Sequence, residues 1–409
     1  MATQNNKGNV ISSQPSLRGG TTKQSVSLIP KLRFKEFEGE WEEILLDDFA
    51  IRGSGHTPSK SHTEYYNGNI NWISLSDSKR LDNGYIDETN TKITELGIKK
   101  SSAVLHPKGT VLLSRDAGVG KSAVMKHAMA VSQHFIVWKT KANKSSNWFL
   151  YNWLQIMKPQ FERIAIGNTI KTIGLPYFKK LKIVCPAFEE QQKIANFLTA
   201  LDTKLQQLNT KKEKLAQYKK GVMQQLFSQQ LRFKEDDGSD FSDWEEKRLG
   251  EIATKKSSNI AANTIEVNIG NYKLYGASGY LKSIDFYREE EAFVSIVKDG
   301  AGVGRTLLCE PRSSVLGTLD IISPKIKVDL YFLYSVLNNI RFNKYIIGST
   351  IPHIYFKDYS KEKIEIPCFE EQQKIATYLS AIDTKIEAVQ TQITQTQAFK
   401  KGLLQAMFV

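Results

Sequence analysis

A glycine-rich turn, AGVGKS at 117–122, is the first candidate for chemistry in this sequence. A phosphate-binding P-loop has the pattern G-x-x-x-x-G-K-[ST], because its backbone amides must wrap the phosphates. The position of the first glycine is Arg115 here, and a second copy of the turn, GAGVGRT at 300–306, has Arg305 in place of the lysine. The sequence therefore argues against a nucleotide-dependent switch at this turn.

The same turn suits contact with DNA. Glycine lets the backbone come close to a phosphate or a base edge, and basic side chains nearby supply charge. The alternative is a plain hairpin turn with solvated charges. The candidate DNA-binding residues of the two copies are Arg115, Lys121, Lys298 and Arg305.

A second repeated segment reads GNTIKT at 167–172 and GSTIPH at 348–353. Small hydroxyl side chains beside a basic residue can bind phosphates or base edges. The alternative is a polar loop that caps a following element. The candidate DNA-binding residues here are Thr169, Lys171, Thr350 and His353.

Other catalytic patterns are missing from the sequence. None of the six histidines pairs with cysteine or acid at zinc spacing, and no serine sits in a G-x-S-x-G elbow. The three cysteines are far apart, which excludes a disulfide framework and fits a reducing cytoplasm. The acid pairs at 189–190 and 370–371 open long helices, so we interpret them as partners of the helix dipole. We expect a chain that is not an enzyme and holds no metal or cofactor.

The charge balance indicates a polyanionic partner. The chain carries a formal net charge of +13 and has a pI near 9.3. The two long helical segments carry +3 and 0, which leaves +10 on the rest of the chain. A purely structural coiled-coil protein would not need that excess. No apolar run approaches the 18 residues of a membrane-spanning helix.

The chain is a tandem duplication. FEEQQKIA at 188–195 recurs 181 residues later, and KKGVMQQLF at 219–227 matches KKGLLQAMF at the same offset. Each repeat has a variable front part and a nearly fixed back part. We expect a flexible basic tail at 1–30, head 1 at 31–187, a central helix at 188–228, head 2 at 229–368 and a C-terminal helix at 369–409.

The fixed parts predict two long helices, because their apolar residues alternate in steps of four and three. An antiparallel pair joined through this seam explains the connectivity and gives a pseudo-twofold axis. The alternative is two surface helices, each packed on its own domain. The seam should continue through Tyr218 and Phe399, with Lys212 and Thr396 as polar interruptions. The residues expected to form the coiled coil or to dock partners are Ile194, Leu198, Leu201, Leu205, Leu208, Ile375, Leu379, Ile382, Ile386 and Val389.

The variable parts predict two α/β heads, so the fold class is α+β. Strands are expected in head 1 at 71–75, 110–114, 122–125 and 135–138, and in head 2 at 292–298 and 315–323. A helix should follow the strands in each head, at 147–157 and 328–339.

These features together resemble the specificity (S) subunit of type I restriction-modification enzymes. The resemblance covers nearly the whole chain after residue 30. It depends on the repeated FEEQQKIA, the head starts GEWEEILL and DWEEKRLG, and the segments 55–77 and 275–287. In and beside those segments we expect further DNA contacts from Thr57, Ser59, Lys60, Lys79, Lys273 and Tyr275.

The resemblance implies a division of labour. Each head would be a target recognition domain that reads one half of a bipartite, asymmetric DNA site. The helices would set the spacing and dock two methyltransferase subunits, which bind S-adenosylmethionine. Two motor-nuclease subunits would use ATP and Mg²⁺. A free-standing DNA-binding regulator is the alternative, and it would bind its site tightly without partners.

Overall fold

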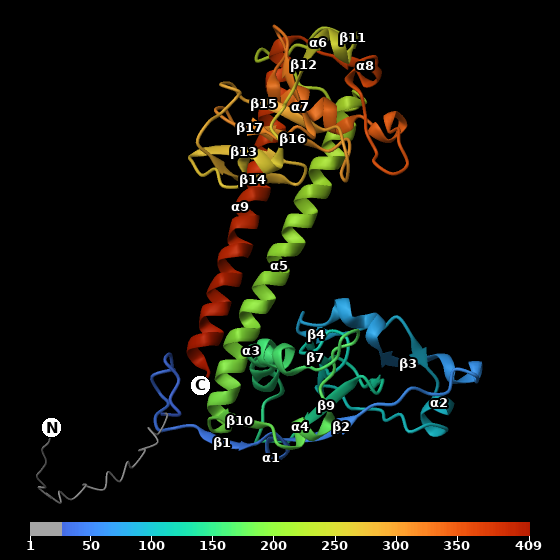
Figure 1. The fold of residues 1–409 in the computed structure, drawn as a ribbon, viewed down its shortest axis with the longest axis vertical. Helices are drawn as coiled ribbons and strands as arrows, with labels where there is room; N and C mark the ends of the chain where they lie inside the picture. The colour runs from blue at the N-terminus through green and yellow to red at the C-terminus, as the bar shows by residue number, and fades with distance from the viewer. Residues whose placement is uncertain (1–26) are drawn as a thin grey trace, which may run out of the picture. The chain divides into compact units, whose positions relative to one another are not determined.

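The computed structural model describes residues 27–409, which form two compact units. Unit 1 contains the described residues up to Asp202 together with Ala398–Val409, and unit 2 is Thr203–Gln397 (Figure 1). Head 1 is the part of unit 1 outside the two long helices, and head 2 is the corresponding part of unit 2. Residues 1–26 of the expected tail lie outside the described range.

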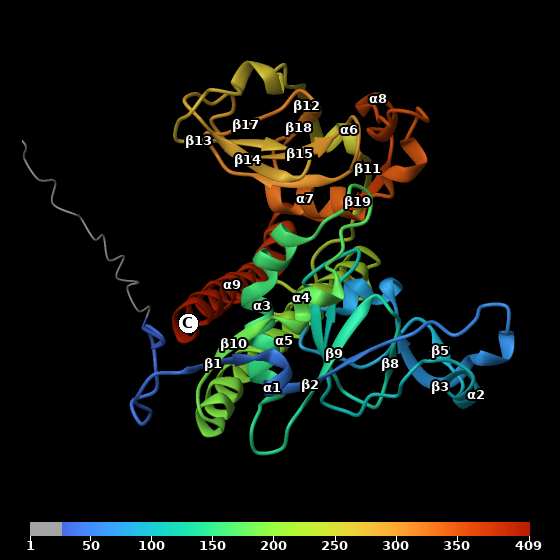
Figure 2. The same ribbon diagram turned by 60° about the horizontal axis from the view of Figure 1, so that its bottom comes forward.

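Head 1 is built on a five-stranded sheet of order β2-β9-β6-β7-β4. A three-stranded sheet of order β5-β3-β8 lies beside it (Figure 2). The strands β6 and β7 are buried at every residue, which explains their continuous apolar runs. The strand bounds are β2 Ala50–Ser54, β3 Tyr66–Ile73, β4 Tyr85–Ile86, β5 Lys92–Ile93, β6 Val111–Ser114, β7 Ser122–Met125, β8 Ala130–Val131 and β9 Phe135–Thr140.

Head 2 repeats this topology with one strand fewer. Its main sheet has the order β12-β18-β15-β16 and its small sheet has the order β14-β13-β17. In both heads the small sheet combines one antiparallel pair with one parallel pair. The strand bounds are β12 Ala253–Ser257, β13 Tyr272–Gly276, β14 Gly279–Ile284, β15 Phe293–Val297, β16 Thr306–Cys309, β17 Ser314–Val315 and β18 Leu319–Pro324.

A two-stranded antiparallel stem closes each head where it meets a long helix. In unit 1 the stem is β1 (Glu42–Leu45) with β10 (Lys182–Cys185), and in unit 2 it is β11 (Glu245–Arg248) with β19 (Lys363–Ile366). Both stems pair four residues in the same register. The stems therefore give each head a natural boundary.

One helix in each head packs on the main sheet. It is α3 (Asn147–Ile164) in head 1 and α7 (Leu330–Asn339) in head 2, capped by the Ser146 and Asp329 side chains. The remaining helices are short: α1 Leu46–Phe49, α2 Glu95–Lys99, α4 Leu175–Lys179, α6 Leu249–Ile252 and α8 Phe356–Tyr359, with 3-10 turns η1 Thr63–Tyr65, η2 Leu75–Arg80, η3 Ala262–Ile265 and η4 Phe342–Tyr345.

The fixed segments form two continuous helices, α5 (Phe188–Phe227) and α9 (Phe369–Met407). In unit 2 the Lys219 ammonium binds the Asp383 carboxylate, at 2.6 Å. In unit 1 the repeat-related pair is Lys400 with Asp202. The residue numbers of the two partners add to the same value in both pairs, so the same antiparallel register is present in each unit.

The seam is part of two different cores. Ile194 and Leu198 pack into the main core of unit 1, and Ile375, Leu379, Ile382 and Ile386 pack into that of unit 2. Among the described residues, only a small cluster belongs to the helices alone, formed by Leu208, Val389 and Ile393 with Leu205 and Leu215 beside it. Leu201 is a half-buried neighbour of the unit 1 core. Helix pairing and packing on the heads, the two alternatives from the sequence, are therefore both present.

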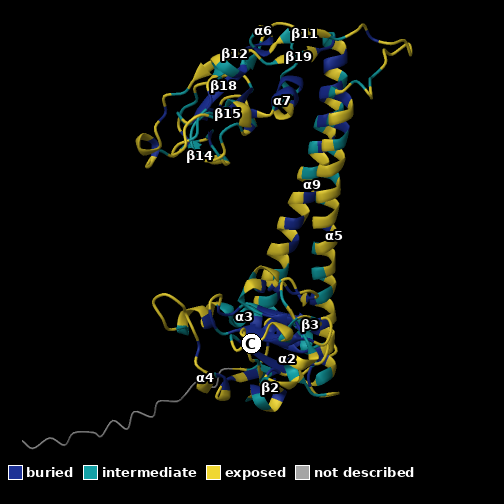
Figure 3. Ribbon diagram, turned by 90° about the vertical axis from the view of Figure 1, so that its right-hand side faces the viewer, coloured by how far each residue is buried: buried dark blue, intermediate teal, exposed yellow. Residues whose placement is uncertain are grey.

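Four predictions from the sequence need correction. Tyr218 and Phe399 are 52% and 56% exposed, so they lie outside the seam. Figure 3 shows how exposed and buried residues alternate along α5 and α9. The predicted strand 315–323 is two strands, because a turn at Gly317 interrupts it. Helix α3 runs past the predicted end through Pro159, since Phe161 is buried in the core. Finally, Leu28, which we assigned to the flexible tail, packs on the unit 1 core.

None of the helices within 27–409 is both long and apolar enough to cross a membrane. All three cysteines are free, and burial raises the pKa of Cys185 and of Cys309 to about 11.

Candidate nucleic-acid interface

Two ion pairs with buried carboxylates fix the heads to the long helices. Arg33 donates two hydrogen bonds to the Glu190 carboxylate, at 2.8 and 2.7 Å. Arg232 does the same to Glu371, at 3.3 and 2.8 Å. Both glutamates are almost fully buried. These glutamates lie in the first turn of α5 and of α9, as the helix-dipole interpretation expected, and they also hold the LRFKE segment at the start of each head.

The next residue of each motif attaches the helix of the head. The Gln191 side chain accepts a hydrogen bond from the backbone of Ser146, the N-cap of α3, at 3.0 Å. Gln372 accepts one from Asp329, the N-cap of α7, at 3.0 Å. The repeated Glu-Gln pair was the signal in the sequence for this attachment.

The glycine turns lie where we expected them, between two antiparallel strands of each main sheet. They join β6 to β7 in head 1 and β15 to β16 in head 2. Gly118 and Gly120 have positive φ angles, of 111° and 86°. A Cβ on Gly120 would also meet the Lys158 side chain at 2.8 Å. The turn therefore requires glycine for its conformation and for close packing.

The basic residues of the turns hold neighbouring segments. Arg115 donates to the Gln133 and Ile173 carbonyls at 3.1 and 3.2 Å. Lys298 lies 3.3 Å from the buried Asp320 carboxylate. Each of these cations is half-buried. Their direct contact with DNA stays a prediction.

The last basic residue of each turn binds a different partner in each head. Lys121 donates to the backbone carbonyl and the hydroxyl of Ser78, in η2, at 3.1 and 3.2 Å. Arg305 donates to the Ala277 carbonyl, in the turn between β13 and β14, at 2.9 Å. Equivalent side chains thus position unlike segments.

The two repeated loops predicted separately from the sequence lie together. The Ala117 amide of the glycine turn donates to the Lys171 carbonyl at 3.1 Å, and the Gly300 amide donates to the Pro352 carbonyl at 2.9 Å. Thr169, Lys171 and Thr350 are exposed, and His353 is half-buried. The helices that follow, α4 and α8, have no side-chain cap, so the capping alternative is wrong.

Head 1 has a cavity of about 660 Å³ whose lining includes Gln133, the residue that accepts a hydrogen bond from Arg115. Thr57 and Lys60 line it, together with the rings of Tyr66 and Trp72. The Tyr66 hydroxyl donates to the Pro58 carbonyl at 2.5 Å, which anchors the exposed strip containing Ser59. Lys79, in η2, is also exposed.

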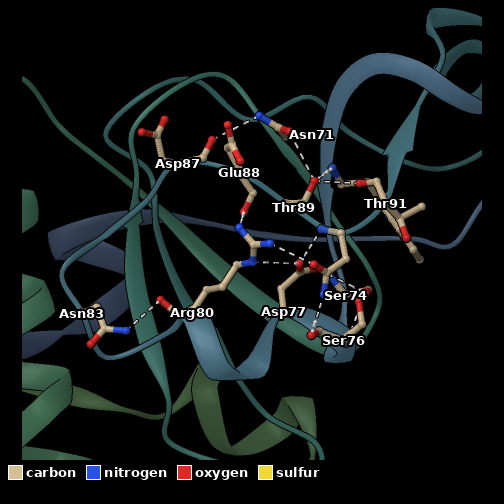
Figure 4. Close-up of polar contacts among 12 residues, drawn as sticks. Asn71, Ser74, Ser76, Asp77, Arg80, Asn83, Asp87, Glu88, Thr89 and Thr91 are labelled. Carbon is tan, nitrogen blue, oxygen red and sulfur yellow. Dashed lines mark hydrogen bonds and ion pairs between the residues drawn. The ribbon is translucent and has the colours of Figure 1, made fainter. Parts of the chain in front are cut away.

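A buried carboxylate that we missed in the sequence organises the η2 segment. Asp77 accepts a hydrogen bond from the Ser74 amide at 3.0 Å (Figure 4). It accepts another from the Asn90 amide at 2.7 Å and has no exposed surface. Arg80 lies 3.9 Å from the same carboxylate. These contacts hold η2 against the loop at 87–91, so the residues exposed on η2 have a fixed position.

The β13–β14 hairpin occupies the corresponding place in head 2. Lys273 binds the Glu310 carboxylate, and this hydrogen bond raises the pKa of Lys273. Tyr275 is only 8% exposed and packs in a core cluster, so its ring cannot meet DNA as we expected. Tyr280, which we had not selected, is 57% exposed on the same hairpin.

Comparison with known proteins finds relatives of one kind, the specificity subunits of type I restriction enzymes. The profile of the family "Type I restriction modification DNA specificity domain" matches residues 38–217 and 241–396. The type I restriction enzyme MjaIX specificity subunit of Methanocaldococcus jannaschii is 26% identical over 400 residues, which cover 89% of this chain and 92% of that protein. The EcoR124I/EcoR124II specificity subunit of Escherichia coli is 29% identical over 179 residues, 42% of this chain and 43% of that protein.

A solved structure has the same fold. The crystal structure of a type I restriction-modification system S subunit from M. genitalium aligns with a TM-score of 0.64 at 18% identity. It covers 93% of this chain and 99% of that chain. The family match spans both heads and most of both long helices, so this chain belongs to the type I restriction-modification DNA specificity family.

Proposed function

We propose that each head of this specificity subunit reads one half of a bipartite DNA site, and that the two halves differ in sequence. The observation that carries this proposal is the pair Lys121 and Arg305. These equivalent residues, on equivalent turns, fix η2 in one head and the β13–β14 hairpin in the other. A common frame that presents unlike segments suits one task performed on two different sequences.

The chemistry belongs to partner subunits in this proposal. Two methyltransferase subunits would bind S-adenosylmethionine, and two motor-nuclease subunits would use ATP and Mg²⁺. This chain would contribute recognition and assembly. Its excess of basic residues supplies the electrostatic part of DNA binding, which falls steeply as salt rises.

The paired helices would set the half-site spacing and offer a docking surface. The exposed face of α5 in unit 2 carries a hollow of about 700 Å³ lined by residues that include Thr210, Lys214 and Tyr218. Inserting one helical turn in both helices, at repeat-related positions, should change the spacing between methylated half-sites. If that spacing stays the same, the helices do not set it.

Co-purification with the methyltransferase subunit, followed by mapping of methylated adenines, tests the function. The proposal predicts a stable complex that marks one split, asymmetric sequence. A chain that binds a specific duplex tightly while forming no such complex would be a free-standing regulator, and the proposal would be wrong.

A further inference from the structure

Each head presents two isoleucines to solvent on the same small loop. The loops, called isoleucine loops here, are IGNTIK at 166–171 and IGSTIP at 347–352. Ile166 and Ile170 are 80% and 58% exposed, and Ile347 and Ile351 are 49% and 64% exposed. Isoleucine stabilises a fold when it is buried, so four exposed isoleucines at repeat-related positions do not serve folding.

The loops are closed and held in shape. Ile166 and Thr172 exchange two backbone hydrogen bonds, at 3.0 and 2.9 Å, and Ile347 and His353 exchange two at 2.9 Å. The glycine that follows each first isoleucine has a positive φ angle, 133° in head 1 and 87° in head 2. A Cβ on Gly167 would lie 2.2 Å from the Ile170 carbonyl oxygen. The tight turn thus displays the isoleucines on a fixed backbone.

The surroundings of the loops are polar and basic. Each loop is hydrogen-bonded to the glycine turn of its head, next to Arg115 in head 1 and Lys298 in head 2. Within the first loop the isoleucines flank Asn168 and Thr169, and Lys171 follows them. A protein-docking surface is usually a larger continuous apolar patch. Two apolar side chains among hydroxyl and basic groups fit duplex DNA better.

The loops share one sequence pattern, so they suit a feature of the DNA that is common to both half-sites. The segments that differ between the heads, η2 and the β13–β14 hairpin, are elsewhere, whereas the loops keep the pattern Ile-Gly-x-Thr-Ile. A methyltransferase must take its target base out of the stack in either half-site. We propose that the isoleucine loops are apolar wedges that enter the DNA at each half-site and stabilise the unstacked base step. This inference rests on the proposed function.

Fluorescence of 2-aminopurine, which rises when the base is unstacked, tests the wedge. The complex with methyltransferase subunits would be given its mapped duplex, with 2-aminopurine in place of the target adenine of one half-site. The variants are Ile166→Ala with Ile170→Ala in head 1, and Ile347→Ala with Ile351→Ala in head 2. Ile51→Ala and Ile326→Ala, at positions 55% and 93% exposed, are matched controls outside the loops.

We expect each double variant to lose most of the fluorescence rise in its own half-site only. On a second duplex that keeps the target adenine, methylation of that half-site should slow by roughly tenfold, the size expected when a contact to the unstacked state is lost. The controls should behave as wild type. All four changes are at exposed positions, so melting temperatures should stay within a degree or two of wild type.

An unchanged fluorescence rise in both double variants would overturn the wedge. The same holds if the variants lose the methyltransferase subunit, because the loops would then dock protein. Failure of the proposed function is distinguishable, since the wild-type complex would then mark no split sequence before any variant is made.

Discussion

The two heads share one frame but differ in the segments that we propose to read the DNA, η2 in head 1 and the β13–β14 hairpin in head 2. Both have the same main sheet, the same small sheet, a four-residue stem and a helix capped at the same point. Head 1 adds the strand β4 and the η2 segment, with the buried Asp77 at its centre. Head 2 instead extends the β13–β14 hairpin. These differing segments lie beside the glycine turn, where we propose that the DNA sequence is read. Other differences, such as the helix α2 of head 1, occur outside them.

The frame depends on interactions that occur twice. Arg33 with Glu190 and Arg232 with Glu371 are one example. A second is the backbone hydrogen bond from Leu231 to Gln225, at 3.1 Å, which has its counterpart from Leu32 to Ala406, at 2.8 Å. The bond between Leu231 and Gln225 lies within a short stretch of chain. The bond between Leu32 and Ala406 joins the two ends of the described chain. The duplicated frame is therefore kept even where the chain is not continuous.

Breaking the ion pair that holds a head on its long helix should give the largest effect, a loss of stability of that unit. Arg232→Met leaves the Glu371 carboxylate buried without its cation, and we expect unit 2 to lose about 3 kcal/mol of stability. Arg33→Met should do the same to unit 1. Hydrogen-exchange mass spectrometry of the full chain would resolve the two units.

The matched control is Lys363→Met. Its pair with Glu246 is exposed on both sides, at 68% and 59%, so the loss should be under about 1 kcal/mol. Equal losses in Arg232→Met and Lys363→Met would show that the buried pair does not fix the frame.

Removing the hydrogen bonds that position η2 or the β13–β14 hairpin should have a smaller effect, on recognition of one half-site only. Lys121→Met removes the bonds to Ser78, and Arg305→Met removes the bond to Ala277. Because such charged hydrogen bonds contribute about 1.5–3 kcal/mol, discrimination at one half-site should fall by about tenfold or more while the other half is unchanged. Competition binding with duplexes mutated in one half measures this.

Lys108→Met, an exposed cation in head 1, controls for the lost charge. It should weaken binding to all duplexes alike and leave the discrimination between duplexes unchanged. If Lys121→Met and Lys108→Met behave identically, Lys121 does not position the reader.

The smallest effect is a pH dependence confined to head 1. Burial lowers the pKa of His106, whose ring donates to the Ser54 carbonyl. As the pH falls below about 6.5, the unfolded chain takes up a proton that the folded head resists, so unit 1 loses stability and unit 2 does not. Thermal melts at pH 7.5 and 5.5 would show this difference.

His106→Gln keeps a donor near the same place without a titrating ring. It should reduce the acid sensitivity of unit 1. A wild-type protein whose two units lose stability equally at pH 5.5 would contradict the role of His106.

Much of the frame could be predicted from the sequence, because it is local and repeated. The repeat located α5 and α9, and the apolar runs located β7 and α7. The contacts of the candidate site could not be predicted in the same way. The partners of Lys121 and Arg305 are 43 and 28 residues away and depend on how each head folds. The burial of Tyr275 and of Asp77 is likewise a tertiary property that neighbouring residues do not reveal.

The central claim is that each head reads its own half-site. The stems allow a direct test, since residues 249–362, between β11 and β19, can be replaced by residues 46–181, from between β1 and β10. Methylated adenines would then be mapped for the complex of this hybrid with its methyltransferase subunits. The account predicts a symmetric site made of two inverted copies of the half read by head 1. A hybrid that assembles and still marks the original asymmetric sequence would contradict it.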